Sequence, residues 1–187
     1  EKKGTSSKST DIITNFVIND TKEHVSRKEV NTVIAWLEYS KIIGNCDLLS
    51  NRRMYFMDCG IANSIASKIA ISNETVRVLI AETFVYDELY RLYKLGKFKG
   101  DKPSCSVYNN YELDFFVVDK EDRKYGIEVK SMRSTKHLSL DYFKDNKLID
   151  EGYLAEISRW GKSGINKIPI YLIYRFPFKG EENANNR

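Results

Sequence analysis

Glu112-Leu113-Asp114-Phe115-Phe116 and Ile127-Glu128-Val129-Lys130 are the two segments that decide the fold, and a polar turn at Asp119 to Arg123 separates them. Both alternate apolar and charged residues, as strands with one buried face do. The alternation predicts that one face of the first strand carries Leu113, Phe115 and Val117. The other face is predicted to carry Glu112, Asp114 and Phe116.

A hairpin centred near Glu121 would place position 114 opposite 128 and position 112 opposite 130. Glu128 and Lys130 share a face in this register, so two carboxylates and an ammonium come together. Facing carboxylates repel unless a cation, a proton or a donor lies between them. Oxygen ligands favour Mg²⁺ or Mn²⁺, with Asp114 and Glu128 as the metal ligands. The alternative is an ordinary surface strand pair in which Glu112 forms an ion pair with Lys130.

A long helix is predicted over Val76 to Leu95, where apolar residues recur at three-and-four spacing without Gly or Pro. Ser72 and Asn73 are its candidate caps. Glu82 lies beside the apolar stripe of this helix. It is either an exposed helical glutamate or a further acid for the site.

These segments resemble the PD-(D/E)XK nuclease superfamily, whose site is an Asp on one strand followed by Glu-x-Lys on the next. The matching residues are Asp114 and Glu128-Val129-Lys130, with Leu113 where the motif has Pro. The resemblance implies Mg²⁺-dependent phosphodiester hydrolysis, with Asp114, Glu128 and Lys130 as catalytic residues. It also implies an auxiliary role for Glu82, because superfamily members often carry an acid on the first helix.

Two further runs are similar to the DUF4143 module of prokaryotic AAA-type ATPases. They are Glu82-Thr83-Phe84-Val85-Tyr86-Asp87-Glu88-Leu89 and Arg53-Met54-Tyr55-Phe56-Met57-Asp58-Cys59-Gly60-Ile61, the latter near that family's K-Y-Y-x-x-D-x-G-L segment. The resemblance covers about Asp11 to Phe176. It implies an upstream ATPase in the same polypeptide, then a winged helix, then the nuclease-like domain.

The N-terminal part predicts helix, turn, helix and hairpin, the outline of a winged helix. The elements are helices over Thr10 to Ile18 and Ser26 to Tyr39 and strands over Ile42 to Leu49 and Met54 to Asp58. Ser26 and Glu29 form a capping box for the second helix. Candidate nucleic-acid contacts are Arg27, Lys28 and Asn31 on that helix and Arg52 and Arg53 on the wing. DNA reading and protein docking both stay open for this segment. A usual winged helix has one more helix ahead, so the chain, which starts without Met, is expected to be a fragment.

The C-terminal part predicts a helix over Leu138 to Ile149 and strands over Tyr153 to Ile157 and Ile168 to Tyr174, after a turn at Trp160 to Asn166. The fold class is therefore α/β (α+β), a restriction-endonuclease-like αβββαβ core with a mixed sheet. The predicted domains are 1–60, the partial winged helix, and 61–178, the nuclease-like domain. Residues 179–187 are predicted to be a disordered tail.

Composition limits the other classes of function. The net charge of +4 is compatible with nucleic-acid contact but is spread along the chain. Three cysteines without C-x-x-C spacing argue against disulfides and structural zinc and favour the cytoplasm. No segment is apolar enough for a membrane span or a signal peptide. Gly161-Lys162-Ser163 lacks the upstream Gly of a phosphate-binding loop, so no ATP binding is expected of this chain.

The predicted function is that of a metal-dependent nuclease-like module, with Mg²⁺ or Mn²⁺ as cofactor and nucleic acid as partner. Two alternatives stay open: a non-catalytic accessory module that binds DNA or a protein, and a transcription regulator that acts through the winged helix. The second alternative predicts duplex binding that depends on Arg27 and Lys28 but not on Asp114.

Overall fold

The computed structural model describes residues 14–15, 17–46, 53–68, 72–132, 137–157, 161–163 and 165–177. Arg52 and the predicted tail at 179–187 lie outside these ranges. The helices are α2 (Arg27–Tyr39), α3 (Cys59–Ala66), α4 (Asn73–Lys94), α5 (Leu138–Asp145) and the 3₁₀ helix η1 (Ile170–Arg175). The strands are β1 (Ile43–Cys46), β2 (Arg53–Phe56), β3 (Ser104–Tyr108), β4 (Tyr111–Val118), β5 (Lys124–Lys130), β6 (Glu151–Glu156), β7 (Gly161–Ser163) and β8 (Ile165–Pro169).

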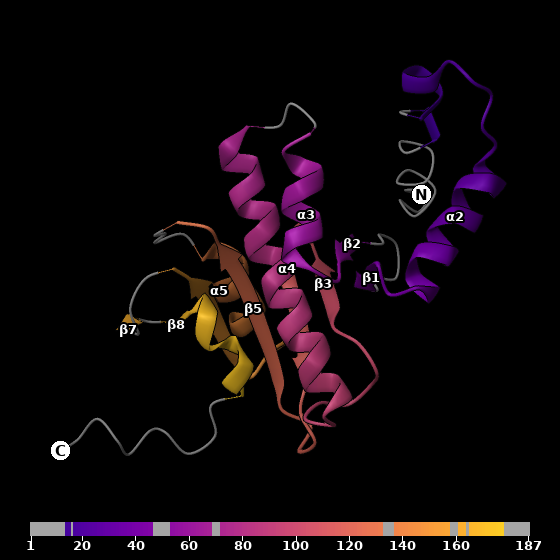
Figure 1. Cartoon of the computed structure of the whole chain (residues 1–187). Helices are drawn as coiled ribbons and strands as arrows, with labels where there is room; N and C mark the ends of the chain where they lie inside the picture. The colour runs from indigo at the N-terminus through magenta and orange to yellow at the C-terminus, as the bar shows by residue number, and fades with distance from the viewer. Residues whose placement is uncertain are drawn as a thin grey trace.

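A six-stranded mixed sheet in the order β3-β4-β5-β6-β8-β7 forms the centre of the molecule. The first three strands are antiparallel, and β5, β6 and β8 run parallel to one another. Helices α4 and α5 lie on opposite sides of this sheet (Figure 1). The mixed α/β class is confirmed, as is the order of one helix, three strands, one helix and further strands.

The helices predicted over Ser26 to Tyr39, Val76 to Leu95 and Leu138 to Ile149 form with shifts at their ends. Ser72 caps α4, and its side chain accepts a hydrogen bond from the Thr75 backbone N–H. Ser26 and Glu29 form the predicted capping box of α2. Helix α5 ends at Asp145 rather than at Ile149, because Lys147 takes a positive φ of 55° that stops the helix.

Helix α3 was not predicted, although its start is encoded in Asp58-Cys59-Gly60. The Asp58 carboxylate caps α3 by accepting from the Ile61 backbone N–H at 2.8 Å. A Cβ on Gly60 would lie 2.9 Å from the same carboxylate oxygen. The Asp-x-Gly part of this motif therefore has a structural explanation.

The predicted last strand, Ile168 to Tyr174, is wrong beyond Pro169. The chain turns into η1 there, and Ile173 and Phe176 are buried while Tyr171 and Tyr174 are exposed. A buried residue at every third position is the period of a 3₁₀ helix, not of a strand. The predicted turn at Trp160 to Asn166 is also wrong in part, because β7 and β8 pair within it.

The predicted hairpin forms as β1 and β2 and packs against α4, but its second strand ends at Phe56 rather than at Asp58, which caps α3. The Tyr55 ring stacks on Tyr86 at a centroid distance of 4.9 Å, and the Tyr86 hydroxyl donates to the Asn45 carbonyl at 3.2 Å. Cys46 and Tyr55 belong to the same hydrophobic core as the sheet. Residues 14–15 and 17–21 are helical ahead of α2. The predicted parts 1–60 and 61–178 thus share one core.

The register predicted for β4 and β5 is confirmed over four pairs, from Phe115↔Ile127 to Val118↔Lys124. The simple alternation along β4 is wrong, however, because the β3–β4 register shifts between Ser104↔Phe116 and Ser106↔Leu113. This irregularity puts Leu113 in the cluster under α5 and Phe115 in the core under α4. Asp114 lies at the bend between them.

The three cysteines are thiols in the described part of the chain. Within the same residues, no helix combines the length and the apolar character needed to cross a bilayer.

Candidate functional site

The backbone pairing between β4 and β5 extends as far as Phe115, and at Asp114 a side-chain hydrogen bond takes its place. Its Oδ2 accepts a hydrogen bond from the Val129 backbone N–H at 2.8 Å, one residue beyond Glu128. The Asp114 side chain is 16% exposed. The bend in β4 therefore ties this carboxylate directly to the Glu-x-Lys segment of β5.

Glu128 and Lys130 form a close pair at the end of β5. The Lys130 Nζ donates to Glu128 Oε1 at 2.6 Å, and the Glu128 side chain is only 13% exposed. Glu128 Oε2 is buried and has no hydrogen-bond partner among the described residues. Burial raises the pKa of Glu128, Lys130 lowers it and the charge of Asp114 raises it further. Glu128 Oε2 is thus available to accept a proton or a cation.

Glu82 reaches the same place from α4. The Tyr55 hydroxyl donates to its Oε2 at 3.4 Å. Burial raises the pKa of Glu82, and the charge of Asp114 adds to this effect, whereas Arg53, Tyr55 and Lys130 oppose it. The structure thus brings Glu82, Asp114, Glu128 and Lys130 into one electrostatic group, which we call the Asp114 cluster.

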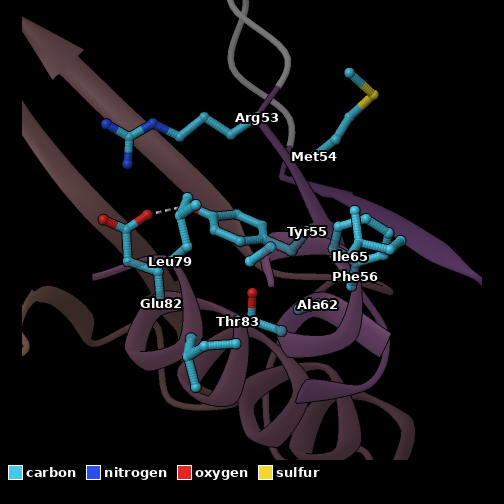
Figure 2. A pocket seen from close by; sticks show the side chains of 11 residues that line it. Arg53, Met54, Tyr55, Phe56, Ala62, Ile65, Leu79, Glu82 and Thr83 are labelled. Atoms are coloured by element: carbon cyan, nitrogen blue, oxygen red, sulfur yellow. Dashed lines mark hydrogen bonds between the residues drawn. The ribbon is translucent and has the colours of Figure 1, made fainter. Parts of the chain in front are cut away.

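Two cavities meet at Glu82. One, of about 260 Å³, is lined by Val78, Glu82, Asp114, Val129, Lys130, Ser131 and Met132. The other, of about 320 Å³, lies between β2, α3 and α4 and is mostly apolar. Figure 2 shows Arg53, Tyr55 and Glu82 among its lining residues, with the hydrogen bond between Tyr55 and Glu82 drawn.

Arg53 takes a position that the sequence did not predict. One guanidinium nitrogen lies 2.7 Å from Glu112 Oε1, and another donates to Asp114 Oδ1 at 3.1 Å. Glu112 therefore forms an ion pair with Arg53 and not with Lys130, the partner in the alternative interpretation. The guanidinium lies against the Asp114 cluster, and its contact with nucleic acid stays a prediction.

The remaining predicted contact residues lie on α2. Arg27, Lys28 and Asn31 line a shallow surface together with Trp36, whose side chain is 67% exposed. Trp36 was not among the predicted contacts, although an exposed indole beside basic residues is a stacking surface for bases.

Two more charged pairs flank the cluster. His137 Nδ1 lies 2.6 Å from Asp141 Oδ2, and the His137 charge lowers the pKa of Glu128. On β6, Glu156 is the ladder neighbour of Lys130, is 2% exposed, and pairs with Lys167 at 3.3 Å. Neither pair was predicted. Glu156 and Lys167 lie on different strands, whereas His137 and Asp141 have the i,i+4 spacing that a helix brings together, which is a signal the sequence does carry.

The donors of the cluster fit a hard divalent cation. Asp114 and Glu128 supply carboxylate oxygens, and the buried Glu128 Oε2 has an unused acceptor. Across the described ranges, no group of three or more His, Cys, Asp or Glu side chains is placed to hold a metal ion. Asp114 and Glu128 are the two residues of the cluster that could hold a cation, and water would have to complete its shell.

Asp87 on α4 is a half-buried acid outside the Asp114 cluster. Burial, followed by the charges of Asp58 and Glu88, raises its pKa to about 7. Its Oδ1 is buried and finds no partner in the part of the chain that the structure describes. The folded protein therefore holds a proton between about pH 4 and 7 that the unfolded chain has released, so stability falls as the pH rises through this window.

We expect Asp87→Asn to raise the free energy of unfolding by about 1–2 kcal/mol at pH 8 and to leave it nearly unchanged at pH 4. The gain is smaller than for a fully buried acid, because solvent screens this half-buried carboxylate. Urea unfolding at both pH values measures this difference. Asp145→Asn, at an exposed position on α5, is the control and should change neither value. Equal effects of Asp87→Asn at both pH values would contradict the shifted titration.

Comparisons with protein-family models, with curated proteins and with solved structures find no match to this chain. The resemblance to DUF4143 and to PD-(D/E)XK nucleases thus stays a prediction.

Proposed function

We propose that this chain is the C-terminal, nuclease-like part of a prokaryotic AAA-type ATPase, with a restriction-endonuclease-like core behind a partial winged helix. Its reaction is Mg²⁺- or Mn²⁺-dependent hydrolysis of a nucleic-acid phosphodiester. The order of helix, three antiparallel strands, helix and parallel strand supports this fold. The cytoplasmic location and the upstream ATPase belong to the same proposal.

The observation that carries the proposal is the convergence of the predicted residues. Asp114 Oδ2 is hydrogen-bonded to the backbone of Val129, which lies between Glu128 and Lys130. Glu82 approaches from α4, and the charge of Asp114 raises its pKa while the charge of Lys130 lowers it. Partly buried acids of one cluster are costly for a fold unless they bind something, and Glu128 Oε2 is a buried oxygen with no hydrogen-bond partner among the described residues.

Each residue has a role that follows from its position. Asp114 and Glu128 hold the cation, and Glu82 orients water from the side of α4. Lys130, whose side chain is 31% exposed, can turn its ammonium towards the scissile phosphate and stabilise the negative charge that develops there. The bound cation would supply Lewis-acid polarisation of the phosphate and a water of lowered pKa.

Calorimetric titration of Mn²⁺ tests the site. We expect the wild type to bind Mn²⁺ and Asp114→Asn to bind it at least about tenfold more weakly, because one carboxylate ligand is lost. Asp122→Asn on the β4–β5 turn is the control and should bind like the wild type, since this acid pairs with Lys99 at the surface. A wild type that binds no Mn²⁺ and leaves DNA and RNA intact with either metal would refute the proposal.

A non-catalytic accessory module is the second candidate, and one observation favours it. Both oxygens of Asp114 already have partners, Arg53 and the Val129 N–H. If this arrangement is purely structural, the module serves the ATPase by binding DNA or a protein. Arg27, Lys28 and Asn31 on α2, with Arg52 and Arg53, would then be the contacts, and substitutions at Arg27 and Lys28 would weaken duplex binding while Asp114→Asn would not.

A further inference from the structure

We infer that Arg53 is an internal counter-ion that occupies Asp114 until a divalent cation displaces it, so that the β1–β2 hairpin controls metal binding. This inference rests on the proposed function, because it assumes that the Asp114 cluster binds a metal. It assigns Arg53 a regulatory role in the site.

Both carboxylate oxygens of Asp114 accept a hydrogen bond. Its Oδ1 accepts from Arg53 at 3.1 Å, and its Oδ2 accepts from the Val129 N–H at 2.8 Å. A carboxylate oxygen that binds a metal must direct a free lone pair at the cation. The Val129 N–H occupies Oδ2, and the Arg53 guanidinium occupies the other oxygen, Oδ1. Two positive charges on one carboxylate oxygen repel, so the guanidinium and a divalent cation compete for Oδ1.

Glu112 gives the guanidinium a second partner. Arg53 lies closer to Glu112, at 2.7 Å, than to Asp114, at 3.1 Å. The Glu112 side chain is 40% exposed and that of Asp114 is 16% exposed. Arg53 can therefore release the more buried carboxylate and keep an ion pair at the surface, which makes displacement possible without an unpaired guanidinium.

The hairpin also holds the second acid of the cluster. Arg53 and Tyr55 are two residues apart on β2 and share a face of the strand. The Tyr55 hydroxyl donates to Glu82 while Arg53 donates to Asp114. Figure 2 shows the Arg53 guanidinium and the Glu82 carboxylate at the same end of the pocket. β2 thus contacts both Glu82 on α4 and Asp114 on β4, so a shift of β2 would alter both contacts.

The test is calorimetric titration of MnCl₂ into the full chain of the wild type, Arg53→Gln, Arg53→Lys and Arg123→Gln. We expect Arg53→Gln to bind Mn²⁺ about tenfold more tightly than the wild type, because the competing charge is gone. Arg53→Lys keeps the positive charge but loses the planar guanidinium that reaches both Glu112 and Asp114. Its affinity for Mn²⁺ should therefore lie between those of the wild type and Arg53→Gln. Arg123, near Glu151 at the surface, is the control and its substitution should have no effect.

The outcomes separate this inference from the proposed function. Mn²⁺ binding by the wild type, with equal or weaker binding by Arg53→Gln, overturns the counter-ion role and leaves the metal site standing. Absence of Mn²⁺ binding in the wild type and in both Arg53 variants overturns both. Thermal melting checks that each variant folds. If Arg53→Gln does not fold, Arg53→Lys decides: tighter binding than the wild type supports the inference, and equal or weaker binding overturns it.

Discussion

Lys130→Met is expected to slow phosphodiester cleavage by about 10²–10³-fold while Mn²⁺ binding persists. Lys130 lines the same cavity as Asp114 and Glu82, and its ammonium donates to Glu128 Oε1. In the proposed reaction it stabilises the charge that develops on the phosphate, a contact made most strongly in the transition state. Its loss should therefore lower the rate much more than it lowers affinity for substrate or metal.

Single-turnover cleavage of labelled DNA and RNA, beside Mn²⁺ titration, separates these effects. Lys124→Met is the matched control, since Lys124 begins the same strand and is exposed to solvent at the far end of β5. This control should cleave like the wild type. A Lys130→Met variant that cleaves normally would show that the ammonium has no part in the chemistry. A variant that loses Mn²⁺ binding as well would make Lys130 a structural partner of Glu128.

The parts of the fold that depend on local pattern could be predicted from the sequence. The β4–β5 register follows from the polar turn at Asp119 to Arg123, and four observed pairs agree with it. The cap at Ser72 and the capping box at Ser26 follow from side-chain chemistry within one helical turn. Because the acids lie next to these elements, the residues of the Asp114 cluster could be named before their geometry was known.

The parts that depend on a distant partner could not be predicted. The irregularity at Asp114 arises from the shifted pairing with β3, which no pattern in β4 records. Arg53 and Asp114 are 61 positions apart, and only the packing of the hairpin on α4 brings them together. Ile170 to Arg175 has strand-like composition, but the β6–β8 ladder ends at Pro169 and the buried positions beyond it recur every third residue.

Gly44→Ala is expected to destabilise the folded protein by about 3 kcal/mol through overpacking. A Cβ at this position would lie 2.2 Å from the Tyr86 hydroxyl oxygen and within 2.7 Å of two ring atoms. Tyr86 is 1% exposed, stacks on Tyr55 and donates to the Asn45 carbonyl, so moving its ring would cost these contacts. The methyl group must therefore push β1 away from α4.

Urea unfolding of Gly44→Ala and Gly152→Ala measures this effect against a matched control. Gly152 is also a strand glycine, but a Cβ there would find its nearest atom at 3.4 Å, which is ordinary contact, so we expect a change within about 1 kcal/mol. Equal stability of the two variants would show that the hairpin can shift on α4 at little cost. Gly44 pairs with Tyr55, two residues from Arg53, so a displaced β1 carries β2 with it. The same variant, if it folds, should therefore also weaken the Arg53 contact with Asp114. Under the proposed counter-ion role of Arg53, it should bind Mn²⁺ more tightly than the wild type, and the fit of Gly44 on Tyr86 would then influence the proposed metal site.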